Sequence, residues 1–300
     1  NYAYQTKASN QTFSINRNDK KSIEITNEKQ VGNLKIYKKD FDDSNKNIKN
    51  ATFVLKSSYG KGYLKVKATG NSVTNEKSTG YATKIVGSAT INDSTNNTND
   101  KVVVFTETKV NATKFVTDSS GKISIKNLIS TINGTANITY TIEELSNDNY
   151  GYTKKVNNLT TTVERLDVRK VIFRNEKQVG NIGIKKVDDR VESKKLTGVE
   201  FVLKSSYKKD TYIKVKGTCT NSTKDKNGYL TSATGNVVIN DTAENSKTPS
   251  IEYVTKMEDA TKFVTDANGQ LAIQNLLMST NGTDKITYKF IETKNPNYGY

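Results

Sequence analysis

The chain has 300 residues, of which 33% are hydrophobic and 26% are charged, and its formal net charge is +15. It contains no histidine and one cysteine, Cys219, which excludes an intrachain disulfide and removes the residue that most often serves as general base or transition-metal ligand. No stretch approaches the roughly 18 consecutive apolar residues of a membrane span, so we expect no span. We also expect no metal site and no cofactor.

The excess of positive charge does not follow the pattern of a nucleic-acid interface. Lysines are spread along the whole chain, are often separated by Asp or Glu, and form no long basic run with interleaved aromatic residues. A solvated basic surface accounts for this distribution, and we expect no nucleic acid among the partners.

A long repeat organises the chain. The sequence NEKQVGN occurs at residues 27–33 and again at residues 175–181, 148 positions later, and Asn-Tyr-x-Tyr segments begin at residues 1, 149 and 297 with the same spacing. A repeat of this length corresponds to a whole domain. The expected division is into residues 1–30 as the C-terminal strands of a preceding repeat, residues 31–178 as repeat 1, and residues 179–300 as repeat 2 without its last strand.

Short strands are expected throughout both repeats. They are rich in Val, Ile, Thr, Tyr and Phe, and Asn, Asp, Ser and Gly separate them, a pattern typical of β-sandwiches. In repeat 1 they include residues 34–38, 52–56, 63–67, 101–106, 122–125, 138–144 and 169–174. In repeat 2 they include residues 182–186, 200–204, 212–216, 262–264, 270–273 and 286–292. Short helical turns are expected only at residues 128–133 and 276–281.

The join between the repeats holds only a few residues and no Pro-rich or Gly/Ser-rich linker. The last strand of one domain should therefore lead almost directly into the first strand of the next, and we expect a head-to-tail rod with limited bending.

Three residue types that can react with one another recur at the same offset. Each repeat has a lysine in its first strand and a glutamate in its YTIEE or YKFIE strand. In addition, the asparagine that opens each NEKQVGN copy lies at the end of a strand. The candidates are Lys38 and Lys186, Glu144 and Glu292, and Asn175 and its earlier counterpart Asn27.

Strand alternation predicts where these side chains point. Successive side chains of a strand face opposite sides, so Lys38 shares a face with the apolar residues two and four positions before it, and the same holds for Glu144 and Asn175. Any one of these three residues alone would ordinarily be a solvated strand residue. Because all three share a strand face with apolar residues, and the arrangement is repeated, we expect their side chains to point inward. The adjacent alternatives Lys39, Lys185 and Glu143 fall on the opposite face.

Inward-pointing groups of this kind can be joined by amide exchange. Burying an unpaired charge is expensive, so such groups are neutralised, paired or reacted. A neutral lysine amine can attack the side-chain carbonyl of an asparagine while a protonated glutamate polarises that carbonyl and transfers protons. Ammonia leaves and a Lys–Asn isopeptide bond remains, so the pattern predicts a self-catalysed cross-link between the first and last strands.

With these residues in view, the chain resembles the collagen-adhesin B-type (CnaB-type) domains, also called SpaA-type pilin domains, of Gram-positive surface proteins. The similarity rests on KKD and KVD in the first strands, the FVLK segments that follow, the turns FVTDSSG and FVTDANG, and the YTIEE and YKFIE strands with their NYGY ends. It implies an all-β fold of tandem immunoglobulin-like β-sandwich domains, a location outside the cell on the surface or cell wall, and cross-link roles for Lys38, Asn175, Lys186 and Asn27, with Glu144 and Glu292 as catalysts.

Two functions are open at this stage. The favoured one is a structural stalk or shaft segment of a cell-surface adhesin, pilus or fibre, whose partners are neighbouring repeats or subunits of the same protein and which is not a turnover enzyme. The alternative is an adhesin module that binds a host protein or carbohydrate through the polar insertions at residues 69–100 and 218–249, which are long for the family.

The two ends of the chain carry a separate expectation. Residues 1–30 match, in register, the strand that residues 179–300 lack, and Asn27 is of the acceptor type for Lys186. Lys186 is therefore expected to bond either to an asparagine one repeat further along a longer parent chain or to Asn27 of a neighbouring chain, beside Glu292, by strand addition.

Overall fold

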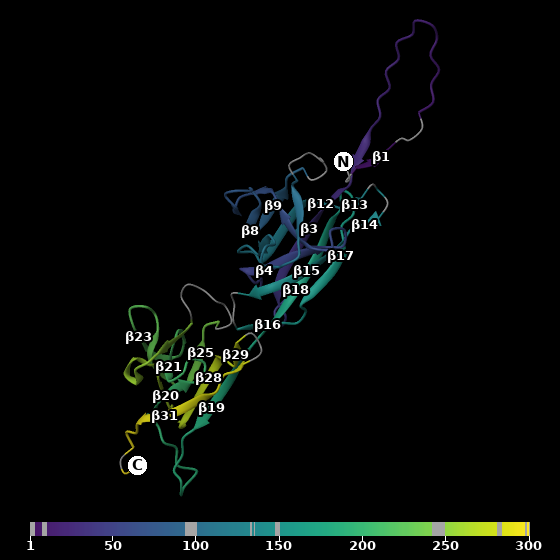
Figure 1. Cartoon of the computed structure of the whole chain (residues 1–300). Coiled ribbons are helices and arrows are strands. Elements are labelled where there is room, and N and C mark those ends of the chain that lie inside the picture. The colour runs from purple at the N-terminus through teal and green to yellow at the C-terminus, as the bar shows by residue number, and fades with distance from the viewer. Residues whose placement is uncertain are drawn as a thin grey trace. The chain divides into compact units, whose positions relative to one another are not determined.

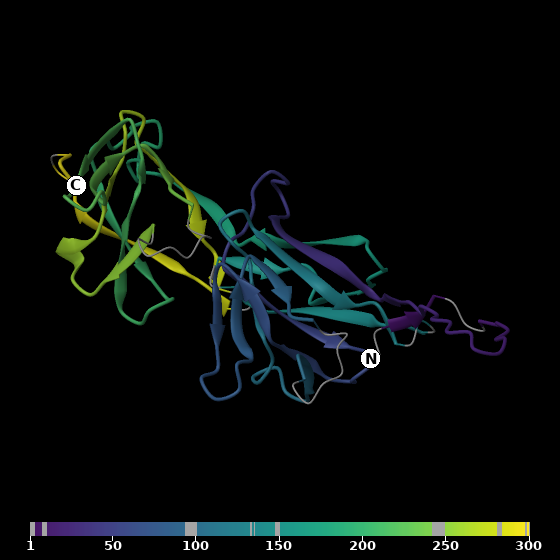
Figure 2. The ribbon, with the colours of Figure 1, turned by 90° about the horizontal axis from the view of Figure 1, so that it is seen from above.

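The computed structural model in Figure 1 describes residues 4–7, 11–93, 101–132, 134, 136–147, 151–241, 250–280, 284–297 and 299. Parts of the Asn-Tyr-x-Tyr segments (residues 1–3, 149, 150, 298 and 300) and of the two insertions (residues 94–100 and 242–249) lie outside these ranges. The chain divides into unit 1, Asn1–Asn147 with Lys155–Asn175, and unit 2, Asp148–Lys154 with Glu176–Tyr300. In Figure 2 the strands of unit 1 run from purple to teal and those of unit 2 from teal to yellow.

The all-β prediction is confirmed. Among the described residues the only helical element is a single 3-10 turn, η1 (Met257–Asp259), and no helix there is long and apolar enough to cross a membrane. The helical turns expected at residues 128–133 and 276–281 are wrong, because strands occupy both places. The strands there are β12 (Lys122–Ile129), β13 (Thr131–Ile132), β28 (Gln270–Leu277) and β29 (Ser279–Thr280).

A bulge explains why the strand continues where a turn was expected. Strand β12 pairs antiparallel with β3 (Val31–Asp40), shifts register between Ile125 and Leu128, and then resumes its pairing opposite Gly32 and Val31. Asn127, inside the bulge, has φ 62°. Backbone pairing with a neighbouring strand thus overrides the local sequence, as is usual for bulges near a sheet end.

Unit 1 has two main sheets. The first has the order β10-β5-β4-β11-β8-β7, and β15 pairs with β4 and with β17. Its strands are β4 (Ala51–Ser57), β5 (Tyr63–Val66), β7 (Val73–Asn75), β8 (Ala82–Val86), β10 (Val103–Thr106), β11 (Lys114–Val116), β15 (Thr139–Asn147) and β17 (Asn158–Thr162). The second has the order β18-β3-β12-β9-β6. Its further strands are β6 (Ala68–Gly70), β9 (Ser88–Ile91) and β18 (Val168–Lys177), while β16 (Tyr152–Lys154) belongs to unit 2. A separate hairpin joins β13 to β14 (Ala136–Asn137).

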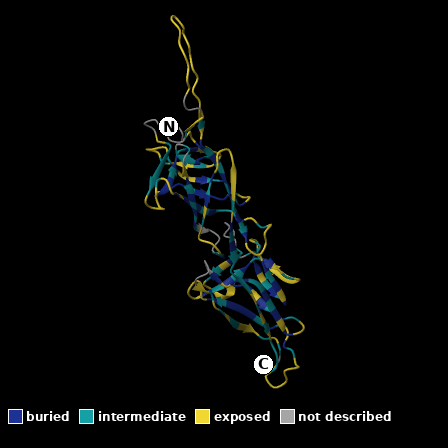
Figure 3. Cartoon of the chain, turned by 90° about the vertical axis from the view of Figure 1, so that its right-hand side faces the viewer, coloured by how far each residue is buried: buried dark blue, intermediate teal, exposed yellow. Residues whose placement is uncertain are grey.

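The two sheets of unit 1 enclose one hydrophobic core, so the unit is a β-sandwich (Figure 3). Strand β3 shows why: its burial alternates along its whole length, with every second residue from Gly32 to Asp40 buried. Leu34 and Ile36 from this sheet pack in the same cluster as Phe53 and Ile142 from the other. Period-two alternation in both sheets thus produces the two inner faces of a sandwich.

Unit 2 repeats this strand order. One sheet has the order β23-β24-β27-β20-β21-β26 with β31 on β20, and the other has the order β19-β28-β25-β22. Its other strands are β19 (Val179–Lys185), β20 (Glu200–Ser205), β21 (Thr211–Val215), β22 (Gly217–Thr218), β23 (Asn221–Lys224), β24 (Leu230–Thr234), β25 (Asn236–Ile239), β26 (Ile251–Val254), β27 (Lys262–Val264), β30 (Asp284–Lys285) and β31 (Tyr288–Lys294). No described strand of unit 2 corresponds to β17 or β18, so β19 lies at a sheet edge.

The N-terminal residues form a small separate sheet. Strand β1 (Tyr4–Thr6) pairs antiparallel with β2 (Asn27–Lys29). The connecting residues 11–26 are exposed throughout and appear as the yellow excursion near the N-terminus in Figure 3.

One glycine fixes the backbone beside Lys38. The Gly121 carbonyl accepts a hydrogen bond from the Lys38 amide (2.8 Å), and Gly121 has φ +67°. A Cβ at this position would lie 2.8 Å from the Lys38 carbonyl oxygen. Only glycine combines this left-handed conformation with so close an approach.

Replacing Gly121 with alanine should therefore destabilise unit 1 more than a matched change elsewhere. Gly80→Ala is the control, because Gly80 has φ +73° but a Cβ added there would have nothing within 4 Å. We expect about 1 kcal/mol of lost unfolding free energy for Gly80→Ala and at least about 2 kcal/mol for Gly121→Ala. Urea unfolding measures both, and equal losses would show that the close approach to Lys38 imposes no constraint.

Candidate functional site

The structure brings Lys38, Glu144 and Asn175 together inside unit 1. Lys38 Nζ donates to Glu144 Oε2 (2.8 Å) and to Asn175 Oδ1, and Asn175 Nδ2 donates to Glu144 Oε1 (2.9 Å). Lys38 and Asn175 are 0% exposed and Glu144 is 4% exposed. The inward orientation predicted from strand alternation is therefore the one found, and an amine, a carboxyl group and an amide lie within hydrogen-bond distance of one another.

Strand topology places each member of this triad. Lys38 lies near the end of β3, Asn175 on β18, and Glu144 on β15 of the opposite sheet. Strands β3 and β18 are parallel neighbours, with Phe173 opposite Lys38 and Asn175 opposite Asp40. The Phe41 amide also donates to the Asn175 carbonyl (2.8 Å). Residues 137 positions apart thus meet because the first and last strands of the unit are adjacent.

Aromatic rings form the wall of the triad. The Phe53 and Phe173 rings lie 4.9 Å apart, and Lys38 Nζ lies 5.9 Å from the centroid of the Phe173 ring. Both phenylalanines are fully buried. In an apolar site closed to water, the polar atoms of the triad interact mainly with one another, which strengthens each hydrogen bond.

The adjacent alternatives point elsewhere. Lys39 Nζ donates to the Ser44 carbonyl at the surface (2.7 Å). Glu143 accepts a hydrogen bond from the Tyr63 hydroxyl (3.0 Å) and forms an ion pair with Lys109. Burial of the Tyr63 hydroxyl, followed by its hydrogen bond to Glu143, raises the pKa of Tyr63 above its ordinary value. Neither residue faces the triad, so each is a matched control for its neighbour.

Within the described residues of unit 2, two members of the corresponding group lie together. Lys186 Nζ lies 3.1 Å from Glu292 Oε2, with side-chain exposures of 32% and 36%. Asn27, the third candidate, lies exposed on β2, where it pairs with Thr6 of β1. The structure therefore brings Lys186 and Glu292 together and does not bring Asn27 to them.

Sequence reasoning missed the role of Gly121 and the aromatic wall. Gly121 was expected only as a turn glycine, whereas its carbonyl holds the Lys38 amide. The signal was present: FVTDSSG and FVTDANG end in glycines at one repeat offset, and the Gly269 carbonyl likewise accepts from the Lys186 amide (2.7 Å).

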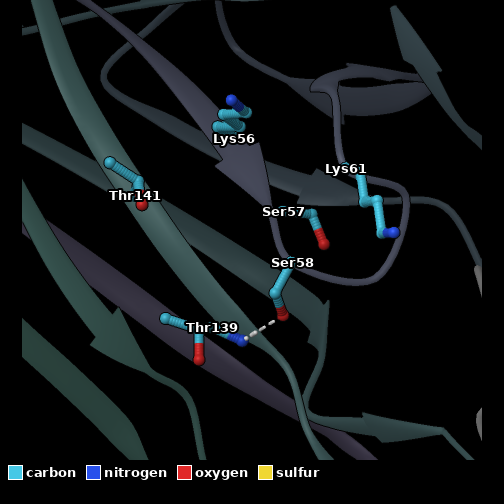
Figure 4. Close-up of a pocket in the computed structure, with 6 residues that line it drawn as sticks. All are labelled: Lys56, Ser57, Ser58, Lys61, Thr139 and Thr141. Atoms are coloured by element: carbon cyan, nitrogen blue, oxygen red, sulfur yellow. Dashed lines mark hydrogen bonds between the residues drawn. The ribbon is translucent and has the colours of Figure 1, made fainter.

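A shallow surface pocket is the other feature that recurs in both units. Lys56, Ser57, Ser58, Lys61, Thr139 and Thr141 line it in unit 1 (Figure 4). The Thr139 amide donates to Ser58 Oγ (3.0 Å), and in unit 2 the Thr287 amide donates to Ser206 Oγ (2.9 Å). These serines thus tie two strand ends together, which is a structural role.

No protein-family model matches this chain, and no curated protein sequence matches it. Among solved structures, the shaft pilin SpaA of Lactobacillus rhamnosus GG is similar, with a TM-score of 0.38, 15% identity and coverage of 90% of each chain. The Bacillus anthracis TIE protein has a TM-score of 0.37 and 19% identity, over 90% of this chain and 30% of that one. A streptococcal ancillary pilin has a TM-score of 0.30 and 14% identity, over 94% and 66%. All three scores are low, so the function is inferred below from this chain's own residues.

The different burial of the two lysines yields a stability prediction. Lys38→Met removes the partner of the buried Glu144 side chain and any link to Asn175, so unit 1 should lose about 3–5 kcal/mol. Lys186→Met breaks a pair whose side chains are about one-third exposed, so unit 2 should lose at most about 1 kcal/mol. Amide hydrogen exchange in urea, resolved by unit, measures both losses.

A double variant separates the charge from the packing. Adding Glu144→Gln to Lys38→Met removes the buried carboxylate charge and should recover part of the loss. Equal losses for the two single lysine variants would contradict the assignment of a buried, mutually dependent triad to unit 1.

Proposed function

We propose that this chain is a structural stalk segment of an extracellular fibre, pilus or adhesin on a Gram-positive cell surface, built from CnaB-type repeats at residues 31–178 and 179–300. In this proposal a self-formed isopeptide bond between Lys38 and Asn175 stiffens the first repeat, and Glu144 catalyses its formation. The observation that carries the proposal is the buried hydrogen-bonded triad that joins the first and last strands of unit 1.

The proposed reaction needs no external reagent. Lys38 Nζ gives a proton to Glu144 and attacks Cγ of Asn175, forming a C–N bond. The attacking nitrogen then loses one proton, which Glu144 passes to Nδ2; the bond from Cγ to Nδ2 breaks and that nitrogen leaves as ammonia. The contacts support this route, because Glu144 accepts hydrogen bonds from both nitrogens concerned, at 2.8 and 2.9 Å. Each triad reacts once, so the protein is not a turnover enzyme.

A bond at this place suits a load-bearing segment. A pull on the two ends of a domain enters through its first and last strands, and here those strands are the neighbours β3 and β18. A covalent link between Lys38 and Asn175 transmits that load past the intervening chain. By analogy with closure of a loop of this length by a disulfide, the link should stabilise unit 1 by about 5 kcal/mol. In a chain with one cysteine it takes the place of disulfides.

The mass of the folded protein tests the bond directly. Each isopeptide bond lowers the intact mass by one ammonia, and peptide mapping should recover a branched peptide that joins Lys38 to Asn175. Glu144→Ala should abolish this branched peptide because proton transfer is lost, while the fold persists with a lower unfolding temperature.

Glu143→Ala is the matched control, since Glu143 lies on the same strand and faces Tyr63 and Lys109. It should leave the branched peptide in full yield. Recovery of the linear peptide containing unmodified Asn175 in full yield from the wild-type chain would refute the proposed function.

Single-molecule pulling provides an independent measurement. With the bond in place, force applied through the chain ends should not extend the residues between Lys38 and Asn175. In Glu144→Ala those 137 residue positions become extensible. The total contour length should then increase by roughly 450–490 Å. An equal contour length for the two proteins would contradict a load path through the cross-link.

A further inference from the structure

The shallow pocket beside Ser58 recurs at the matching place in unit 2. In unit 1 it lies at the hairpin between β4 and β5, and in unit 2 at the hairpin between β20 and β21. The two cavities have volumes of about 310 and 390 Å³. Sites for small molecules commonly span about 300–1,000 Å³, so each pocket has room for a small ligand.

The charged residues of the unit 1 pocket are all basic. Lys56 and Lys61 line it together with serine and threonine hydroxyls, and no carboxylate does (Figure 4). Among the described residues, no Asp or Glu pairs with either lysine. Lys56 Nζ lies 5.7 Å from the centroid of the Tyr63 ring. The carboxylate bonded to the Tyr63 hydroxyl, that of Glu143, is already paired with Lys109. Within the described part of the chain, the pocket thus presents two ammonium groups without a counter-charge.

The unit 2 pocket reaches the same net charge with different residues. Lys204, Lys209 and Lys289 line it. Asp210 lines it as well and pairs with Lys204 (2.8 Å). Lys289 stands at the repeat position of Thr141, so the extra acid of unit 2 is accompanied by an extra base. Both pockets therefore have a net charge of +2, which indicates that the charge matters more than the particular side chains.

Buried serines add hydroxyl donors to these ammonium groups. Ser57 is 3% exposed and Ser205 is 2% exposed, and both line their pockets. Their Oγ atoms accept hydrogen bonds from the Tyr59 and Tyr207 amides, each at 3.2 Å. The next serine in each unit accepts from a threonine amide in the same way. A hydroxyl that accepts from the backbone keeps its own proton to donate, so each pocket holds two oriented donors.

One charged lining residue of each pocket has a left-handed backbone. Lys61 has φ 50°, although glycines stand on both sides of it, and Asp210 has φ 57°. This conformation is unfavourable for a residue with a Cβ, and such residues concentrate at functional positions. The hairpins therefore retain an unfavourable backbone at the residues that set the charge of the pockets.

We propose that each pocket binds a phosphate monoester, a site that does not depend on the isopeptide bond. A phosphate monoester carries a charge of about −1.5 to −2 near neutral pH and has three strong acceptor oxygens. That charge matches the net +2 of either pocket, and the lysine ammonium groups and serine hydroxyls supply the donors. A sulfate ester or a phosphodiester carries a single negative charge and matches less well. The rest of the cavity accommodates the group that carries the phosphate.

Backbone amide shifts of the whole chain, recorded by NMR at constant ionic strength, test the class of ligand. Glucose 6-phosphate should give saturable shifts at residues 57–62 and 205–211, and glucose should give none. Glucose 6-sulfate, with one charge, should bind at least about threefold more weakly. Equal affinity for the two esters, or no saturable shift at either hairpin, would overturn the proposal.

Inorganic phosphate separates the ester from the free ion. It should compete for both pockets but bind more weakly than glucose 6-phosphate, because it leaves the rest of each cavity unfilled. Inorganic phosphate that bound as tightly as glucose 6-phosphate would overturn the ester as the ligand.

Lysine variants test the assignment of the unit 1 pocket. Lys56→Met with Lys61→Met should weaken binding of glucose 6-phosphate there by at least about tenfold, while unit 2 serves as an internal reference. Lys84→Met with Lys35→Met is the control, because it removes the same charge from unit 1 outside the pocket. Equal weakening by the two double variants would show that only the overall charge attracts the ligand.

A gain of affinity in unit 2 is the sharpest outcome. Asp210→Asn releases Lys204 and raises the charge of that pocket to +3, so glucose 6-phosphate should bind there about threefold more tightly and unchanged in unit 1. Asparagine tolerates the left-handed backbone at this position. Lys289→Thr should have the opposite effect. Unchanged or weaker binding in Asp210→Asn would contradict a ligand held by the pocket lysines.

Discussion

The cost of placing a lysine inside a β-sandwich governs the rest of unit 1. Lys38 is 0% exposed, and a lone ammonium in that position would destabilise the fold by several kcal/mol. Its partners therefore have to be present and correctly placed, and they come from two other strands in two different sheets. One charged side chain thus imposes a requirement on strand order, on register and on the turn at Gly121 that holds its backbone.

Strand topology meets that requirement by making the first and last strands parallel neighbours. The sheet order puts β18 beside β3, while β15 reaches across from the opposite sheet. In the described residues of unit 2 no strand corresponds to β17 or β18; the same lysine and glutamate pair there but are about one-third exposed, and nearby apolar side chains are only partly buried. The contrast between the units assigns both the exclusion of water from the site and the completeness of the core to this pair of strands.

The parts of this picture that could be predicted are those with a local signature. Alternation in LKIYK and VIFRN sets the inward phase of Lys38 and Asn175, and the 148-residue offset relates the two copies. The short strands β7, β8 and β9 were not predicted, because they lie in a polar insertion and depend on pairing with β11 and β12. The bulges at Asn127 and Asn275 were likewise unpredictable, since their positive φ values serve a register set by distant strands.

The separation of the triad along the chain also determines when it can form. Lys38 is synthesised 137 residues before Asn175, so the three groups cannot meet until the last strand of the unit has been made and has settled beside the first. Chain segments that are only partly folded hold a lysine with no amide in reach. Any irreversible chemistry at this site therefore follows native packing, so a bond between these groups would require that the sandwich had already closed in the correct order.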